Sequence, residues 1–258
     1  MTQDESNPEK AGLKISVVTV CFNDGDTIGD TIQSANCQTY RNFEHIFIDG
    51  ASSDNTLEVI ATNSSVEKVV LSDPDDGIYD AMNKGIEKAK GDIVGFLHAD
   101  DCFADSTVLE DIAGCFADPA IQAVYGDLQY VHKDNVGKVV RKWQCLEFTP
   151  ERLKRGWMPP HPTLYVRRQW YSLVGGFDIR YRIAADYYFI LQLFSEQKFR
   201  ATYLPRVLIK MRTGGASNRS LANIWSKSLE DFSALRRSGI GGAWTLVAKN
   251  LRKINQFW

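Results

Sequence analysis

Two adjacent carboxylates, Asp100 and Asp101, follow the apolar run 93–97, which is typical of a buried strand. Burying two unpaired acids is costly, so these side chains must meet water, a cation or both. Acids just beyond the carboxyl end of an inner strand lie where open α/β sheets bind their ligands. Such a pair can hold a divalent metal, Mg²⁺ or Mn²⁺, against a diphosphate. Alternatively, Asp101 caps a helix that begins near Ser106, or is simply solvated.

The composition indicates an ordinary globular protein. The 258 residues carry a formal net charge of −2 and are 44% apolar, which gives no reason to expect a nucleic-acid partner. Five cysteines without CxxC spacing are typical of reduced thiols in the cytoplasm. The polar start and the lack of a long apolar run predict a cytoplasmic protein without a signal peptide or a membrane span.

Strand and helix patterns alternate through the first half of the chain, which predicts a parallel sheet with helices on both faces. The predicted strands are 14–20, 43–49, 66–71 and 93–97. The predicted helices between them carry their apolar faces at 28–35, 57–60 and 78–89. Asp26 or Thr27 can cap the first helix, and Asp54 can cap the second.

The second half has a different pattern. Strands are predicted at 123–130, 137–143, 163–167 and 201–211, with an irregular loop at 157–162 and an apolar helix around 187–194. The tail from 221 predicts two helices broken near Gly239–Gly242. We therefore expect a flexible start at 1–12, a main domain over 13–218 and C-terminal helices over 219–258.

Several motifs, in this order and spacing, resemble those of the family 2 glycosyltransferases, which have a GT-A fold. They are the opening strand 15–23, the acidic segment 48–56, the His-Ala-Asp-Asp run 98–101, and Gly-Gly-Phe-Asp at 175–178 followed by Ala-Asp-Tyr at 185–187. Segments 75–85 and 211–217 are similar to a bacterial subgroup that builds O-antigen and exopolysaccharide repeat units. One departure is His98, which stands where the family often has an acid.

The resemblance implies an α/β GT-A fold with a mostly parallel central sheet, flanking helices and a helical C-terminal tail. It also implies a metal-dependent, inverting transfer of a sugar from a UDP-sugar to a saccharide acceptor that is lipid-linked in this subgroup. Asp100 is identified as the ligand of Mg²⁺ or Mn²⁺ and Asp101 as a second ligand or a supporting acid. Asp186 is identified as the general base. From the residues alone, Asp186 fits an acid in the first turn of a helix.

Five residues are candidates for binding the donor nucleotide. Asp49 can accept the uracil N3–H, Phe22 can stack on the ring, and Val20 ends the neighbouring strand. Asp76 and Asn83 lie around the start of the next helix. The alternatives are that Asp49 caps a turn, that Phe22 is a core residue, and that Asp76 and Asn83 serve only as helix-capping side chains.

Two further loops can contact the acceptor or the diphosphate. Prolines flank His161 and stiffen its backbone, so that its imidazole can face a sugar, or it is a structural histidine. Arg212 with Gly214 and Gly215 can present a cation and bare amides to a diphosphate and can form a closing loop. The alternative for the glycine pair is a flexible surface turn.

The tail interleaves aromatic residues with basic ones, namely Arg219, Lys227, Arg236, Arg237, Lys249, Arg252 and Lys253. A basic helix with aromatic side chains can lie on an anionic membrane surface. The alternative is a helix packed on the domain with a solvated basic face. In the first case, the protein is peripheral on the inner face of the cytoplasmic membrane.

Two other functions fit parts of the sequence. One is a nucleotide-sugar-binding partner subunit without turnover, although the presence of both Asp100 and Asp186 argues against lost activity. The other is a sugar nucleotidyltransferase, which needs a glycine- and arginine-rich loop after the first strand. Residues 21–25, Cys-Phe-Asn-Asp-Gly, do not supply that loop.

Overall fold

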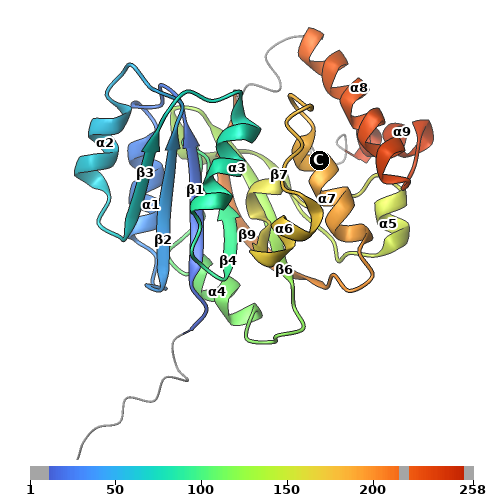
Figure 1. Cartoon of the computed structure of the whole chain (residues 1–258), viewed down its shortest axis with the longest axis horizontal. Helices are drawn as coiled ribbons and strands as arrows, with labels where there is room; N and C mark the ends of the chain where they lie inside the picture. Colours follow the sequence, from blue (N-terminus) through green and yellow to red (C-terminus); the bar gives the residue numbers. More distant parts are fainter. Residues whose placement is uncertain (1–11, 215–220, 253–258) are drawn as a thin grey trace, which may run out of the picture.

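The computed structural model describes residues 12–214 and 221–252, in which nine strands form one sheet (Figure 1). The sheet order is β3-β2-β1-β4-β8-β6-β9-β5, and β7 pairs with β6. The strands are β1 (Ile15–Cys21), β2 (Phe43–Asp49), β3 (Lys68–Ser72), β4 (Ile93–Phe96), β5 (Cys102–Phe103), β6 (Ala123–His132), β7 (Asn135–Trp143), β8 (Tyr165–Arg167) and β9 (Ala201–Arg212).

Helices cover the sheet and extend beyond it. They are α1 (Ile28–Asn36), α2 (Thr56–Asn63), α3 (Ile78–Lys88), α4 (Val108–Cys115), α5 (Pro150–Lys154), α6 (Gln169–Val174), α7 (Ala185–Ser195), α8 (Leu221–Ser238) and α9 (Ala243–Arg252). Within the described ranges, no helix is long and apolar enough to cross a bilayer. The predicted α/β fold is confirmed, as are the two tail helices with a break between them.

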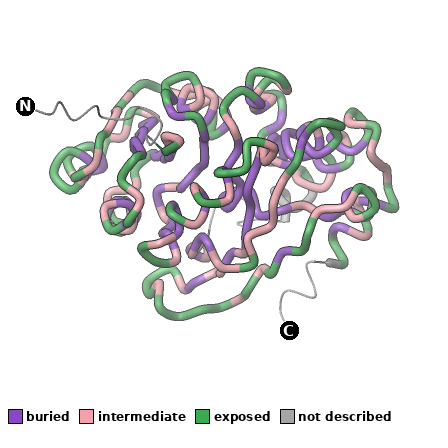
Figure 2. Tube along the Cα trace, turned by 90° about the horizontal axis from the view of Figure 1, so that it is seen from below, coloured by how far each residue is buried: buried purple, intermediate pink, exposed green. Residues whose placement is uncertain are grey.

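The first four long strands form a parallel unit. β1 pairs in parallel with β2 and with β4, and β2 pairs in parallel with β3. This register sets Cys21 beside Asp49 and Asp49 beside Ser72, so the carboxyl ends of the strands share one edge of the sheet. β1, β2 and β4 are buried along their whole length, and the buried parts of the chain run through the middle of the molecule (Figure 2). This explains the apolar sequences of β1 and β4, whereas β2 also buries Glu44, His45 and Asp49.

The second half of the sheet is mixed. β8 is antiparallel to both β4 and β6, β7 is antiparallel to β6, and β9 is parallel to β6. Thr163, predicted to begin a strand, lies instead in a short 3₁₀ helix, His161–Thr163. Its hydroxyl lies 2.8 Å from the carbonyl oxygen of Pro160 and 3.0 Å from that of Gly126, which stabilises the turn.

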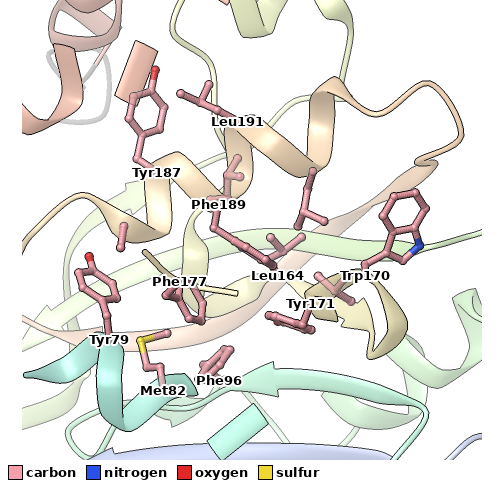
Figure 3. Close-up of a cluster of buried hydrophobic side chains, with 14 of the residues drawn as sticks. Tyr79, Met82, Phe96, Leu164, Trp170, Tyr171, Phe177, Tyr187, Phe189 and Leu191 are labelled. Atoms are coloured by element: carbon pink, nitrogen blue, oxygen red, sulfur yellow. The ribbon is translucent and has the colours of Figure 1, made fainter. Parts of the chain in front are cut away.

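Side chains on the two faces of β1 enter different cores, as the alternation of a strand requires. Val18 and Val20 pack in the core that includes α3 and α7, whereas Ile15 and Val17 pack in the core that includes α4. Figure 3 shows the first core, in which Phe177 lies between Tyr79 of α3 and Phe189 of α7. The helix that carries Asp186 is thereby anchored to the sheet.

The two C-terminal helices pack against the main domain at the end away from α2 (Figure 1). Lys249 of α9 and Asp231 of α8 form a buried ion pair with an Nζ–Oδ1 distance of 2.7 Å. The Lys249 ammonium also lies 3.2 Å from the ring centroid of Tyr187 in α7. These contacts confirm packing on the domain for this part of the tail. The predicted boundary at residue 218 lies outside the described residues.

Candidate active site

The loops after β1 and β2 are bonded to each other at the shared edge of the sheet. Ser52 Oγ accepts a hydrogen bond from the backbone N–H of Asn23 at 2.8 Å, and Asn23 Oδ1 accepts one from that of Ser53 at 2.9 Å. Asn23 and Ala51 both have positive φ, +55° and +61°. Alanine rarely adopts this conformation, so the surrounding hydrogen bonds must maintain it.

Asp49 is fully buried and its carboxylate is surrounded by donors. The backbone N–H of Ser52 donates at 3.0 Å, its hydroxyl at 2.5 Å and the Ser72 hydroxyl at 2.6 Å. Cys21 Sγ adds a weak donor at 3.7 Å. The predicted contact of Asp49 with uracil stays a prediction, and it would require one of these donors to yield. The turn-capping alternative describes the observed arrangement.

Phe22 is an exposed ring beside this loop, which excludes the alternative that it is a core residue. The side chain is 61% exposed. A Cβ atom at Gly50 would lie 3.4 Å from the Phe22 ring and 3.2 Å from a carboxylate oxygen of Asp75. The glycine therefore leaves a bare backbone surface between an aromatic face and an acid. The surface has room for a planar base, and the stacking role of Phe22 stays a prediction.

Asp24, which sequence analysis did not select, joins the acids at this edge. Burial raises the pKa of Asp24, the backbone N–H of Phe22 opposes that rise, and the charges of Asp100, Asp54 and Asp49 add to it. The acids that follow β1, β2 and β4 therefore act on one another. The signal in the sequence was the position of Asp24 just after the first strand.

The loop after β4 is held through hydrogen bonds to its backbone carbonyl oxygens. The Thr31 hydroxyl lies 2.7 Å from the carbonyl oxygen of Asp101 and 3.0 Å from that of Ala99. Arg212 donates to the carbonyl oxygens of Asp100 and Lys133, both at 3.0 Å, and forms an ion pair with Asp30. Arg212 thus positions the acidic loop, whereas we predicted a contact with the diphosphate.

Asp101 is fully buried, and neither of its carboxylate oxygens has a partner in hydrogen-bond geometry. Burial and the neighbouring charge of Asp100 raise its pKa well above the usual range, and the backbone N–H and the charge of Arg212 oppose this rise. The alternative that Asp101 caps a helix is wrong, because the nearest helix, α4, begins after Thr107. A buried carboxylate with free lone pairs needs a proton or a cation.

A divalent cation fits the residues of this loop. Among the described residues, no group of three or more His, Cys, Asp or Glu side chains is arranged to hold a metal. Mg²⁺ and Mn²⁺ do not require such a group, because one or two carboxylates can hold them together with substrate phosphates and water. Asp100, which is half-buried, and the orphaned Asp101 would supply those carboxylates.

Two imidazoles connect the acidic loop to the predicted base. The ring centroids of His98 and His161 are 6.3 Å apart, and His161 also packs on Phe96 and Phe177. Burial lowers the pKa of His98, while the charges of Asp100 and Asp186 oppose that shift. Burial lowers the pKa of His161 to about 4 against the charge of Asp186, so this ring is neutral at pH 7. His98 therefore lies within electrostatic reach of both acids.

Asp186 lies in the first turn of α7 and is half-buried. The hydroxyl of Tyr79 lies 3.1 Å from Asp186 Oδ1 and 2.7 Å from the carbonyl oxygen of Ile183, so its single proton is shared between two acceptors. Burial raises the pKa of Tyr79 well above its usual range, and the charge of Asp186 adds to this rise. Tyr79 therefore stays protonated and orients the carboxylate. Its place in the apolar pattern of α3 gave no signal of this role.

The other predicted site residues have different surroundings. Both ends of the Asn83 amide bond the backbone of Phe177, donating at 2.8 Å and accepting at 2.9 Å, which commits Asn83 to the loop before α7. Asp76 is exposed, and Val20 lies in the core. Gly214 has a φ of +109°, which suits glycine in a turn, and Gly215 lies outside the described residues.

Comparison with known proteins agrees with this architecture. The sequence model of Glycosyl transferase family 2 matches residues 16–177. The chain is 32% identical over 185 residues to an uncharacterised glycosyltransferase of Mycobacterium tuberculosis, covering 69% of this chain and 68% of the relative.

Solved structures share the fold at low sequence identity. The Staphylococcus aureus TarS fragment 1–349 in complex with UDP-GlcNAc superposes with a TM-score of 0.69 at 18% identity, over 88% of this chain and 66% of that one. The mannosyltransferase PcManGT of Pyrobaculum calidifontis, solved with GDP-Man and Mn²⁺, has a TM-score of 0.65 at 17% identity, over 96% of this chain and 72% of that one.

Proposed function

Since this chain belongs to Glycosyl transferase family 2, we propose that it transfers a sugar, with inversion, from a UDP-sugar to a saccharide acceptor. In this proposal, Asp186 removes the proton from an acceptor hydroxyl as the hydroxyl oxygen attacks the anomeric carbon. A bond forms between that oxygen and the anomeric carbon, and the bond from the anomeric carbon to the phosphate oxygen breaks. The electron pair leaves with UDP, so a single displacement needs one base and no nucleophile.

The observation that carries this proposal is the shared electrostatic environment of His98. The charges of Asp100 and Asp186 both act on this half-buried imidazole, although the two acids lie in different halves of the chain. A site for glycosyl transfer needs charge neutralisation at the diphosphate and a base at the acceptor within the length of one sugar. The action of both charges on His98 supports a site in which the acidic loop serves the diphosphate and Asp186 serves the acceptor.

We propose that Asp100, with Asp101 as a second ligand or a support, holds Mg²⁺ or Mn²⁺ when the donor binds. The bound ion would neutralise the charge that develops on the leaving diphosphate. The unpartnered oxygens of Asp101 support this assignment. The presence of Mn²⁺ in the structure of the P. calidifontis mannosyltransferase is consistent with it.

The decisive experiment is Asp186→Asn, which keeps the shape of the side chain and removes its basicity. The transfer rate should fall by about two to four orders of magnitude, which is the usual contribution of a general base. The rate would be followed as UDP release from a panel of UDP-hexoses with Mn²⁺ and a bacterial membrane lipid extract. UDP affinity, measured by calorimetry, should barely change. Near-normal turnover with a large loss of UDP affinity would instead assign Asp186 to binding.

We propose a uracil nucleotide as the donor, with its base on the exposed ring of Phe22. The open backbone at Gly50 and the acid Asp75 beside it support a site for a planar base with an N–H donor. UDP should therefore bind more tightly than GDP or ADP. Equal affinities for the three nucleotides in calorimetry would reject this donor class.

We also propose that the tail docks on the membrane that carries a lipid-linked acceptor. Trp244, Val247 and Leu251 of α9 are exposed and spaced three and four residues apart, so they form one apolar stripe. Arg237 and Lys249 form ion pairs within the protein, with Asp178 and Asp231. The apolar stripe and Arg236 therefore support membrane docking more than the number of basic residues does. Replacing Trp244 and Leu251 with serine should reduce co-sedimentation with anionic vesicles, and Leu173→Ser on α6 should not. Equal vesicle binding by all three proteins would contradict docking through α9.

A further inference from the structure

The segment that leads into α7 is held along its length by one face of α8. Tyr181 Oη lies 3.3 Å from Ser233 Oγ, and the guanidinium of Arg237 lies 3.0 Å from Asp178 Oδ2. Glu230, Ser233 and Arg237 recur at intervals of three and four residues, so they share one face of the helix. This face of α8 therefore follows the segment 178–184 and ends two residues before Asp186.

Glu230 makes the most concentrated contact on this face. Its carboxylate accepts three consecutive backbone N–H groups, from Arg182 at 3.1 Å, Ile183 at 2.8 Å and Ala184 at 3.0 Å. Ala184, at the N-cap position of α7, has no side chain that can cap the helix. Donors at a helix start need partners, and bonds to an ionised carboxylate are stronger than neutral ones. Glu230 thus caps the start of α7 through the Ala184 N–H and holds the two residues before it.

The peptide group between Ile183 and Ala184 links Glu230 to Asp186. Glu230 accepts a hydrogen bond from its N–H, that of Ala184, at 3.0 Å, while the hydroxyl of Tyr79 lies 2.7 Å from its carbonyl oxygen, that of Ile183. The same hydroxyl contacts Asp186 Oδ1. A shift of this peptide would therefore move the tyrosine and the carboxylate together.

We propose that Glu230 is a positioning residue that fixes the direction of the Asp186 carboxylate toward the acceptor hydroxyl. This inference rests on the proposed role of Asp186 as the base. It makes α8 a part of the active site in function, although no atom of Glu230 needs to touch a substrate. The ion pair between Asp231 and Lys249 has a separate role, since it fastens α9 to α8 and to the ring of Tyr187.

The test compares two adjacent acids on α8. Glu230→Gln keeps the side-chain volume but removes the charge and one acceptor. Its kcat should fall about ten- to a hundredfold, because a small misplacement of a reacting group is costly. Its donor KM and its UDP affinity should stay within about twofold, as remote positioning predicts. Asp231→Asn, the matched control, should lower the melting temperature while keeping kcat within about twofold well below its melting point.

Two results would overturn the proposal. One is a normal kcat in Glu230→Gln, and the other is an equal loss of kcat in Asp231→Asn at the same loss of stability. If Glu230→Gln does not fold, Glu230→Asp keeps the charge and withdraws the carboxylate by one methylene. That variant should still lose kcat without losing UDP affinity, and an unchanged kcat would count against positioning.

A double variant separates this inference from the proposed base. When Asp186→Asn has already removed the base, adding Glu230→Gln should cause no further loss in the residual rate. If the two substitutions reduce the transfer rate independently, so that their fold-losses multiply, Glu230 does not act through Asp186. If Asp186→Asn alone retains normal turnover, the proposed base is wrong. If it is inactive while Glu230→Gln is normal, only the positioning role fails.

Discussion

The end of β2 and the loop after β4 each bury a carboxylate at the same edge of the sheet, but their surroundings treat its charge in opposite ways. Asp49 accepts hydrogen bonds from Ser52 and Ser72 and has no exposed surface. Asp101 is equally buried, and its two oxygens have no partner. In the loop after β4, Thr31 and Arg212 instead donate hydrogen bonds to the backbone carbonyl oxygens of Asp101 and Asp100.

This difference separates a structural carboxylate from one that needs a ligand. A buried charge with a full set of donors is stable as it stands and fixes the fold of its own loop. For a buried carboxylate without hydrogen-bond donors, desolvation raises the pKa, so the group binds a proton until a cation takes the place of that proton. Sequence position alone treats both acids alike, whereas their hydrogen bonds assign them to different tasks.

The largest effect is expected from Asp100→Ala. If the loop after β4 holds the metal, donor binding in Mn²⁺ should fall to the level that the wild-type protein shows in EDTA. The fold should persist, because the Arg212 bond goes to the backbone carbonyl of Asp100 and survives truncation. Thermal shift with UDP and Mn²⁺ measures both points. Metal-dependent binding that is unchanged in this variant would remove the distinction between the two regions.

Matched asparagine substitutions test the comparison directly. Asp49→Asn should lower the free energy of unfolding by about 2–4 kcal/mol, because an amide cannot accept from all the donors around it. Asp101→Asn should change it by no more than about 1 kcal/mol, or should stabilise, because it replaces a buried group without partners. Urea unfolding at pH 7 without metal gives both values. A larger loss for Asp101→Asn would mean that its carboxylate has a partner after all.

A smaller effect concerns His45 on β2, a buried group whose charge is excluded. Burial lowers the pKa of His45 to about 3. Between the usual histidine pKa and that value, the unfolded chain binds a proton that the folded protein does not. Stability should therefore fall on acidification, by about 1.4 kcal/mol per pH unit for this imidazole.

His45→Gln can keep a hydrogen bond to the Thr19 hydroxyl, which lies 2.8 Å from His45 Nε2, and it cannot titrate. The plot of unfolding free energy against pH should be flatter for this variant than for the wild type below pH 6.5. Parallel plots for the two proteins would show that His45 is already protonated in the folded state.

Much of the fold and part of the site could be predicted from the sequence. The parallel strands were visible because they are short and rich in apolar residues, three of them buried on both faces, with a helical period between them. Phe22, Asp100 and Asp186 stand where strands end or a helix begins, which is a local signal. β5, of two residues, and α5, of five, are too short to show a period.

The roles of several polar side chains could not be predicted, because their partners are distant in the chain. From the sequence, we predicted that Asn83 binds the donor nucleotide. In the structure, its amide makes hydrogen bonds with the backbone of Phe177, 94 residues away. Arg212 looked like a diphosphate ligand, but it bonds the backbone of Asp100. Each of these side chains can make the same hydrogen bonds with many groups, and local sequence does not say which group comes within reach.

By itself, the sequence determined the alternation of strands and helices, the acids at the strand ends and the motifs of the family. Local propensity and hydrophobic period are sufficient for these features, because they depend on residues within one turn or one strand. Only the tertiary structure decided which carboxylates are satisfied, which is orphaned, and that Glu230 reaches the start of α7. Those outcomes depend on hydrogen bonds between elements far apart in the chain, and on burial, which arises only when the elements pack together.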